Sequence, residues 1–319
     1  MSDLTKKIYF NRARTALKFG LYVLDIKPDE EILVPDYMCD SIFQPISQTS
    51  LKYSVYKTQD NLEPLWASLD SLITSKTKAI LMVHYFGQVQ DINKFLEFSK
   101  KHEIYLIEDN AHGHGGMFND RELGTFGDIG ISSPRKFLNC LDGGILYLNK
   151  SYNTDHFQNM EYSLEELKRP LIKKILDNFP NTKSQLRKLF TERPKYEVPR
   201  IFSEPYVEDL YLHPKISKKI DSMDWNEIRK NRREVYNKLE SKVLASGLHP
   251  IFKSLSPQSN PWCLPAYTKN QKESIDWFDW GWKNNIEVYS WPVLREDQIE
   301  EDNEAFQKWK KIICFSTGN

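Results

Sequence analysis

The chain has 319 residues, with 44 lysines and arginines and 44 aspartates and glutamates, so its formal net charge is zero. A neutral chain lacks the basic excess that draws proteins to nucleic acid or anionic membranes, and no apolar run is long enough to cross a bilayer. Four widely spaced cysteines form no C-x-x-C pair, which argues against a zinc ribbon and against a disulfide framework. The start, MSDLTKK, lacks the apolar core of a signal peptide, so we expect a cytoplasmic protein.

The first 150 residues alternate strand-like and helix-like patterns. Short apolar runs predict buried strands at EILVPDY (31–37), KAILMVHYFG (78–87) and EIYLIED (103–109), and INKFLEFSKKH (92–102) predicts an amphipathic helix. Strand, helix and strand at this spacing predict βαβ units and a mostly parallel sheet flanked by helices, in an α/β domain. Ligands of such sheets bind at the carboxyl ends of the strands, which is where Asp109 lies.

The pattern changes after residue 150. SLEELKRPLIKKILDNF is helical but interrupted by Pro170, and the basic, proline-punctuated stretch that follows it predicts a connecting excursion. A long amphipathic helix is predicted from Pro214 to a stop at Gly247, and short strands and helices follow it. We expect a large domain over residues 1–205 and a small C-terminal α+β domain over 206–319. The aromatic residues, weighted to the last hundred positions, fit core packing and leave room for a ligand groove.

One lysine stands among small polar residues in ISSPRKFLNCLDGG (131–144), between two apolar runs. A lysine that is partly desolvated at a strand end acquires a depressed pKa and becomes an amine nucleophile, most often in a Schiff base with a carbonyl cofactor or substrate. Such a site also needs a carboxylate beside the cofactor's pyridinium nitrogen and a phosphate cradle at a helix N-terminus. Lys136 is therefore the centre of the candidate site.

The other parts of such a site have candidates in the sequence. Asp109, at the end of a predicted strand, supplies the carboxylate. The stretch NRARTALKFGLYVL supplies a cradle at the start of a predicted helix, with Arg14 as a cation and Thr15 as a hydroxyl donor. Ser133 precedes the lysine by three residues and is close enough to share the phosphate, and Tyr37 and Cys39 are placed to lie near the ring.

Each of these residues has a commoner role when it is taken alone. Asp109 would cap a helix, Ser133 and Thr15 would be turn residues, and Cys39 would be a small buried side chain. His112 and His114, with the neighbouring carboxylates, suggest a metal cluster, but no further ligand is well placed, so we expect no metal. The order of the candidates along the chain, each at a junction of strand and loop, favours a shared site.

Three stretches then resemble a known family. EDNAHGHGG, LGTFGDIGISSPRK and LDGG are similar to motifs of the DegT/StrS nucleotide-sugar aminotransferases, which are fold-type-I enzymes that use pyridoxal 5'-phosphate. The resemblance covers about residues 9–150 and continues faintly through IRKNRREVYNKL. It implies a large domain with a mixed, mostly parallel sheet, a small C-terminal domain, and a homodimer with sites at the interface.

The resemblance also implies roles for single residues. Lys136 takes the position of the lysine that binds the cofactor aldehyde, Asp109 that of the pyridinium partner, and His112 that of a residue near the phenolic oxygen. The family's phosphate positions fall on Arg14–Thr15 and on Ser133.

The activity implied is transfer of an amino group, usually from glutamate, to a keto-sugar that is nucleotide-linked, in surface-polysaccharide or related sugar biosynthesis. The partners would be small-molecule substrates, with neither nucleic acid nor membrane. The sequence departs from the family pattern in starting close to the phosphate turn, in placing Cys39 at the ring-stacking position, and in a shorter segment before Lys136. These departures leave two alternatives: a non-catalytic binding or regulatory protein on the same fold, and a pyridoxal phosphate enzyme with another reaction outcome.

Overall fold

The computed structural model describes residues 5–138, 140–157, 160–170, 196 and 208–318. Its larger sheet has seven strands in the order β1-β9-β8-β5-β4-β2-β3. Strands β2, β3, β4, β5 and β8 are parallel, and β9 is antiparallel to both β8 and β1, so β1 runs with the other five. The mostly parallel sheet predicted from the sequence is confirmed. Its strands are β1 (Lys6–Phe10), β2 (Glu31–Pro35), β3 (Lys52–Tyr56), β4 (Thr77–Val83), β5 (Tyr105–Asn110), β8 (Ile129–Ser132) and β9 (Gly144–Leu148).

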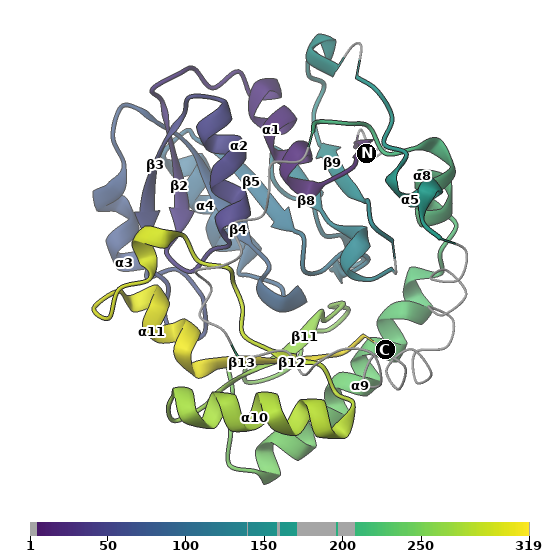
Figure 1. Ribbon diagram of the computed structural model, residues 1–319. Coiled ribbons are helices and arrows are strands. Elements are labelled where there is room, and N and C mark those ends of the chain that lie inside the picture. The colour runs from purple at the N-terminus through teal and green to yellow at the C-terminus, as the bar shows by residue number, and fades with distance from the viewer. Residues whose placement is uncertain (1–4, 139, 158–159, 171–195, 197–207, 319) are drawn as a thin grey trace.

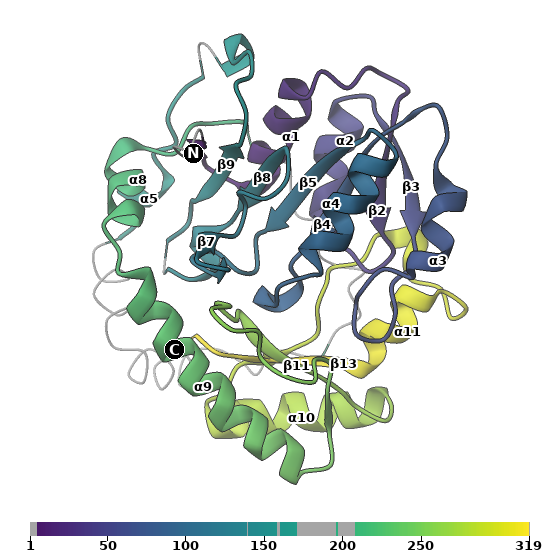
Figure 2. The same ribbon diagram turned by 180° about the vertical axis from the view of Figure 1, so that it is seen from behind.

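Helices cover both faces of this sheet (Figures 1 and 2). Helices α1 (Ala13–Val23) and α2 (Phe43–Gln48) lie on one face, and α3 (Trp66–Leu69) and α4 (Ile92–Lys101) lie on the other. Because a parallel strand covered on both faces buries its side chains, β4 is continuously apolar from Ala79 to Val83, with Leu81 packing toward one core and Ile80 and Met82 toward the other.

A second sheet of four antiparallel strands lies beyond the carboxyl edge of the large sheet (Figure 1). Helices α9 (Trp225–Ala245) and α10 (Gln271–Asn284) cover its outer face. On its inner face, Cys263 and Cys314 belong to the same hydrophobic core as Tyr37, Tyr85 and Phe86, which follow β2 and β4 of the large sheet. The two sheets therefore share one core. The strands are β10 (His249–Pro250), β11 (Cys263–Tyr267), β12 (Val288–Tyr289) and β13 (Ile312–Ser316), and α11 (Glu304–Lys311) precedes the last of them.

The single long helix predicted from Pro214 is wrong, because the structure has two helices there, α8 (Pro214–Asp221) and α9. The chain breaks between them, and the Asp224 side chain accepts hydrogen bonds from the backbone N–H groups of Asn226 and Glu227 as the N-cap of α9. Asp and Asn favour this position because their side-chain oxygens satisfy the first free amides of a helix. A capping aspartate thus starts a new helix inside an amphipathic pattern.

The domain boundary predicted at residue 205 lies outside the described residues, as does most of the predicted connecting excursion. The described part of that excursion includes α5 (Glu165–Lys168), which ends before Pro170. Ile216 and Ile220 of α8 pack against Ile145 and Tyr147 of β9. We therefore propose that the small domain begins with α9.

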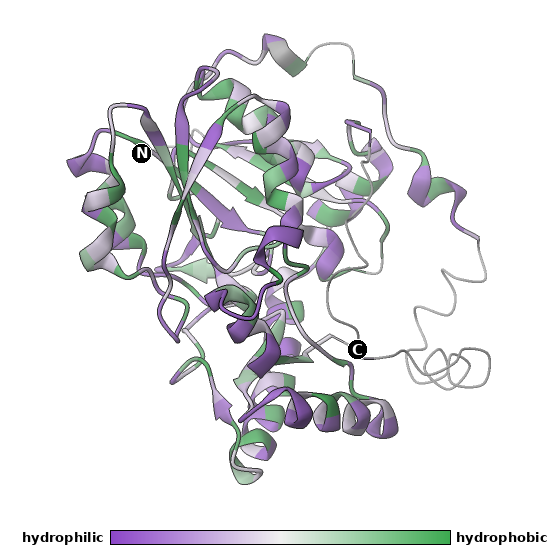
Figure 3. Cartoon of the chain, turned by 60° about the vertical axis from the view of Figure 1, so that its left-hand side comes forward, coloured by the Kyte–Doolittle hydropathy of each residue, from purple (hydrophilic) through white to green (hydrophobic). Residues whose placement is uncertain are grey.

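The helices carry hydrophilic and hydrophobic bands side by side, as expected for helices that cover a sheet (Figure 3). Among the described helices, none is long and apolar enough to cross a membrane. The remaining short elements are β6 (Met117–Phe118), β7 (Arg121–Glu122) and the 3₁₀ turns η1 (Asp40–Ile42), η2 (Asp70–Leu72), η3 (Tyr85–Gly87), η4 (Pro134–Lys136), η5 (Asp155–Phe157) and η7 (Glu296–Gln298).

Candidate active site

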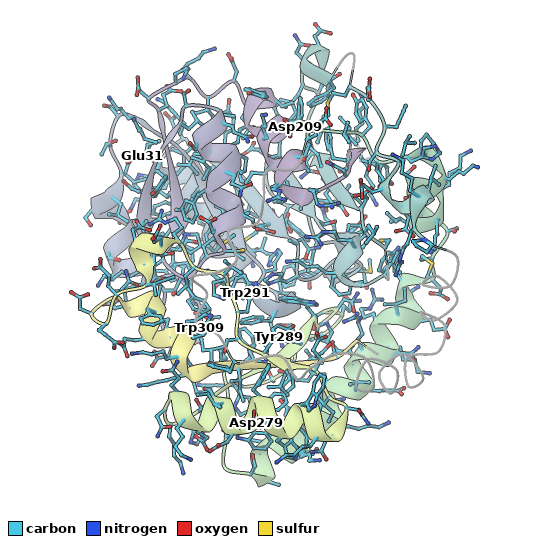
Figure 4. The ribbon with its side chains drawn as sticks, viewed as in Figure 1. Glu31, Asp209, Asp279, Tyr289, Trp291 and Trp309 are labelled. Atoms are coloured by element: carbon cyan, nitrogen blue, oxygen red, sulfur yellow. The ribbon has the colours of Figure 1, made fainter. Side chains whose placement is uncertain are left out.

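The candidate site lies at the carboxyl edge of the large sheet. Because six strands run in the same direction, the segments that follow β1, β4, β5 and β8 gather at this edge. The C-terminal part of the chain meets them there: Trp262 N–H donates to the Phe86 carbonyl (2.9 Å), and the rings of Trp262 and Trp291 lie 4.4 and 4.7 Å from the ring of His112. Figure 4 shows Trp291 and Tyr289 between the two sheets.

Lys136 ends the short turn η4, directly after β8. Its Nζ lies 4.8 Å from the ring centroid of Trp262, so an indole face from the C-terminal part of the chain contacts the amine. The same Trp262 ring lies 4.4 Å from the His112 ring, and Asp109 pairs with Ile131 of β8, the strand that leads to the Lys136 turn. The structure thus brings together Lys136, Asp109 and His112, as the sequence predicted.

Asp109 is buried near the end of β5. Its Oδ1 accepts a hydrogen bond from the backbone N–H of Ala111 (2.8 Å). Burial raises the pKa of Asp109, while the Ala111 amide, Lys136 and His84 oppose that rise without cancelling it. A cation brought next to this carboxylate would stabilise its ionised form.

Glu108 precedes Asp109 and points to the opposite face of β5, because side chains alternate along a strand. It is fully buried and accepts four hydrogen bonds, from His84 Nε2 (2.9 Å) and from the backbone N–H groups of Gly124 (2.6 Å), Phe126 (2.7 Å) and Gly127 (3.2 Å). Glu108 therefore anchors the 124–127 loop.

His112 is enclosed by aromatic rings. Its Nδ1 accepts a hydrogen bond from the backbone N–H of Phe86 (3.3 Å), and its ring stacks on the Phe86 ring. Burial, and secondly Lys136, hold the pKa of His112 well below its usual value. The ring is therefore neutral at neutral pH, and because Nδ1 is an acceptor, the proton is on Nε2, available to donate.

His114 lies in a separate buried network beneath the Lys136 turn. Its Nδ1 bonds Ser132 Oγ (2.8 Å), which also contacts Tyr147 Oη (3.4 Å), and its ring lies edge-on to Trp225. Burial lowers the pKa of His114 to about 3. The network fixes the end of β8, from which the Lys136 turn departs.

This pKa of His114 predicts an acid-sensitive fold. Between pH 6.5 and about 3 the unfolded chain binds a proton on this histidine that the folded chain does not. Each unit by which the pH is lowered in this range therefore reduces the free energy of unfolding by about 1.4 kcal/mol from this group, and above pH 6.5 the group has no effect. We expect His114→Asn to make the unfolding free energy depend less steeply on pH, by the equivalent of one bound proton. Urea unfolding at pH 7, 6 and 5 measures this slope. Parallel curves for the variant and the wild type would contradict this.

Two glycines bring the Lys136 turn against the start of α1. A Cβ on Gly144 would lie 2.2 to 2.4 Å from backbone atoms of Arg12 and Ala13, and Gly143, at φ +149°, packs against the backbone of Arg135. Only glycine permits both approaches. The D-G-G stretch therefore joins the turn that carries Lys136 to the N-terminus of α1.

The N-terminus of α1 carries two arginines. No described side chain caps its first turn, so the first backbone amides keep their capacity to bind an anion. Arg12 forms an ion pair with the buried Asp142, which also accepts a hydrogen bond from Ser163 Oγ (2.5 Å). Arg14 Nη1 donates to Gln44 Oε1 (2.9 Å). The N-terminus of α1 therefore places two guanidinium groups next to uncapped backbone amides, with the charge of Arg12 balanced by Asp142.

Comparison with known proteins places the chain in a family. The model described as the DegT/DnrJ/EryC1/StrS aminotransferase family matches residues 5–167, just over half of the chain. The chain belongs to this aminotransferase family. The family predicted from the sequence is confirmed.

Two relatives of this family member are GDP-perosamine synthases. The enzyme of Escherichia coli O157:H7 is 25% identical over 312 residues, which cover 89% of this chain and 80% of that enzyme. The enzyme of Caulobacter vibrioides is 32% identical over 149 residues, which cover 44% of this chain and 38% of that enzyme. The alignment with the higher identity, to the Caulobacter vibrioides enzyme, thus spans well under half of that enzyme's length.

Solved structures show the same fold over nearly the whole chain. The PLP and PMP forms of a Streptococcus pneumoniae protein match with TM-scores of 0.69 and 0.70 at 16% identity, covering 98% of this chain and 82% and 83% of those chains. The predicted fold-type-I fold is confirmed.

Two residues that the sequence predicted as cofactor contacts, Thr15 and Tyr37, are buried and bonded to other parts of the fold. Thr15 is buried, and its hydroxyl donates to Asn11 Oδ1 (3.0 Å) because this face of α1 packs on the sheet. Tyr37 is fully buried, and its hydroxyl donates to the Trp291 carbonyl. These placements do not support the phosphate contact of Thr15 or the ring contact of Tyr37.

Two further predicted residues lie at the site edge. Ser133 is buried just before the Lys136 turn, and its carbonyl accepts the Lys136 N–H (3.1 Å). Cys39 follows β2 and is partly exposed, and its Sγ accepts a hydrogen bond from Ser41 Oγ (3.3 Å). Their contacts with a cofactor remain proposals.

Sequence reasoning missed Arg12, Trp262 and Trp291. Arg12 adjoins the predicted cradle and could have been found as its second cation. The two tryptophans come from more than 120 residues beyond Lys136, and the enrichment of aromatic residues there was the only signal for them.

Proposed function

We propose that this protein is a pyridoxal phosphate-dependent aminotransferase that moves an amino group from glutamate to a nucleotide-linked keto-sugar, in surface-polysaccharide or related sugar biosynthesis. The observation that carries this proposal is the lysine amine of Lys136, held at one sheet edge with the buried carboxylate of Asp109 and the anion-binding start of α1. The named activities of the GDP-perosamine synthase relatives support the sugar substrate.

The residues at this edge fit pyridoxal phosphate by the chemistry of their donor set. Lys136 would hold the aldehyde, Asp109 the pyridinium nitrogen, and Arg12, Arg14 and the first amides of α1 the phosphate. Ser133 is proposed as a further phosphate ligand, and His112 and Cys39 as the neighbours of the ring. When bound, this cofactor supplies an electron sink for breaking the Cα–H bond of an amino acid.

The chain's own groups would manage protons and water. The Lys136 amine, once free, would take the proton from Cα of the amino donor and return it to the carbon that receives it, as general base and then general acid. Trp262 and Trp291 would keep water from the amine. The neutral His112 would donate its Nε2–H to an oxygen anion without adding a second positive charge near Lys136.

We expect Asp109→Asn to lower kcat by about 100- to 1,000-fold, because a neutral amide cannot stabilise a positive charge on the ring nitrogen. The change keeps the size of the side chain, so stability should hold. Steady-state kinetics would be compared with Asp60→Asn, which alters an exposed carboxyl group. Unchanged turnover in the Asp109 variant would remove this residue from the proposed mechanism.

The function itself is tested in two stages. The purified protein is mixed with pyridoxal phosphate, and uptake is measured as visible absorbance that borohydride removes. L-Glutamate and a panel of nucleotide-linked keto-sugars are then added, and amino-sugar products are sought by mass spectrometry. A protein that takes up no cofactor overturns the proposal and points to the non-catalytic alternative, and uptake without transfer to any sugar points to a pyridoxal phosphate enzyme with another reaction outcome.

We also propose a homodimer, as expected from the family. Sedimentation equilibrium tests this, and a monomer at micromolar concentration would contradict it.

A further inference from the structure

A tryptophan from the small sheet faces the lysine turn of the large domain. The indole of Trp262, the residue before β11, lies 4.8 Å from Lys136 Nζ and 4.4 Å from the ring of His112. Phe86 and Trp291 enclose His112 from other sides, with ring centroids 5.9 and 4.7 Å away. Phe86, His112 and Trp291 are buried, whereas Trp262 is partly exposed. Trp262 is therefore the ring of this aromatic cluster that keeps surface for a ligand.

Backbone contacts fix the position of this indole. The Trp262 N–H donates to the Phe86 carbonyl (2.9 Å), and the Trp262 carbonyl accepts a hydrogen bond from Thr317 Oγ1 (2.9 Å). Two residues earlier, the Asn260 carbonyl packs so closely on Gly87 that a Cβ there would lie 2.2 Å from it. The residue is thus held from the loop after β4 and from the end of β13, and a ligand would bind to a ring that is already ordered.

The large domain offers no ring face at the two positions that the sequence placed near the cofactor. Cys39 has no ring, and its Sγ accepts a hydrogen bond from Ser41 Oγ (3.3 Å). Tyr37 is fully buried, and its hydroxyl donates to the Trp291 carbonyl. An aromatic contact for the cofactor must therefore come from another part of the chain.

The chemistry of the indole suits the cofactor. Its face is electron-rich and attracts cations, as its contact with the Lys136 amine shows, and tryptophan binds cations more strongly than the other aromatic side chains do. A pyridine ring that is protonated at its nitrogen, next to Asp109, is a flat cation that an indole face would attract. The aldehyde carbon that joins Nζ is bonded directly to that ring, so attachment at Lys136 brings the ring within reach of Trp262.

We propose that Trp262 supplies the aromatic surface against which the cofactor's ring binds, so that the small sheet completes the cofactor site. This inference rests on the proposed function. It differs from the exclusion of water described above, because any large apolar side chain excludes water, whereas an aromatic ring also attracts a ring cation. Binding of the cofactor's ring should then depend on an aromatic side chain at position 262, and not on the volume of that side chain alone.

The test uses the full chain and two probes. The first is 4'-deoxypyridoxine 5'-phosphate, which has the ring and the phosphate but no aldehyde, and the second is inorganic phosphate, which has no ring. Dissociation constants are measured by calorimetric titration and, independently, from the shift in thermal unfolding. The variants are Trp262→Phe, Trp262→Leu and Trp262→Ala, with Cys39→Ala for comparison. Trp277→Phe, on the outer face of the small sheet, is the control.

We expect Trp262→Leu and Trp262→Ala to weaken 4'-deoxypyridoxine 5'-phosphate about 10- to 30-fold, while Trp262→Phe, Cys39→Ala and the control stay within about threefold of the wild type. The affinity for inorganic phosphate should change less than about twofold in every variant. Four results would overturn the proposal: the same loss for both probes, a Leu variant that binds as tightly as the wild type, a Phe variant as weak as the Leu variant, or a larger loss in Cys39→Ala. If the Ala variant does not fold, the Leu variant decides.

Failure of the proposed function is distinguishable from failure of this site. A wild-type protein that binds the first probe and takes up pyridoxal phosphate but aminates no sugar would contradict the proposed function, without changing the results expected here for Trp262. A wild-type protein that aminates a sugar, with a Trp262→Leu variant that binds the first probe equally well, would overturn the role of Trp262 alone.

Discussion

Replacing Lys136 with alanine is expected to lower kcat by at least about 10⁴-fold and to abolish the visible absorbance of the pyridoxal phosphate-loaded protein. One side chain would lose two roles at once, because the amine that holds the cofactor is also the proposed carrier of the Cα proton. The fold should tolerate the change, since Lys136 lies at the end of a turn that is held by its backbone and by Pro134. Absorbance spectra and single-turnover kinetics measure both losses.

Lys76→Ala is the matched control for this experiment, because Lys76 is exposed and lies away from the carboxyl edge of the sheet. It should take up the cofactor and turn over as the wild type does. A Lys136→Ala protein that still transaminates would place the reacting amine elsewhere and would end the mechanism proposed here.

Glu108→Ala is expected to lower the free energy of unfolding by about 3–5 kcal/mol. The substitution leaves the buried His84 ring and three backbone N–H groups of the 124–127 loop without their acceptor. Urea unfolding followed by circular dichroism measures the loss.

Glu97→Ala, on the exposed face of α4, is the control and should change the unfolding free energy by less than about 0.5 kcal/mol.

The effects of Glu108→Ala can also be compared with those of Asp109→Asn. The two adjacent carboxyl groups should separate cleanly, with Glu108 affecting stability and Asp109 affecting turnover. A Glu108 variant as stable as the wild type would show that the loop is held by other contacts.

Much of the large sheet could be predicted because its strands are buried on both faces. The runs at 78–87 and 103–109 contain most of β4 and most of β5, and the pairing of β5 with β8 explains why Asp109 and Lys136 come together. Both strands end at the same edge, so the residues after them meet although they are 27 positions apart. Local sequence pattern and parallel topology were therefore sufficient to predict that Asp109 and Lys136 lie close together.

Other features depend on contacts that no local pattern contains. The distinct faces of Glu108 and Asp109 follow from strand alternation, but only the structure shows that the 124–127 loop folds under Glu108. Trp262 reaches Lys136 through a sheet formed after residue 248, and the fold of that sheet depends on packing against the large domain. The break at Asp224 was missed because the hydrophobic spacing continues through it.

The core shared by the two sheets has a consequence for how the chain is made. The Tyr37 hydroxyl is held by the carbonyl of Trp291, 254 residues later, and Gln298 Nε2 donates to the Asp36 carbonyl (2.9 Å), 262 residues earlier. During synthesis the N-terminal half would expose apolar surface at this edge until the last strands emerge from the ribosome. Contacts of such high sequence separation form slowly, so the nascent chain should depend on chaperones more than a protein of the same size built from local contacts.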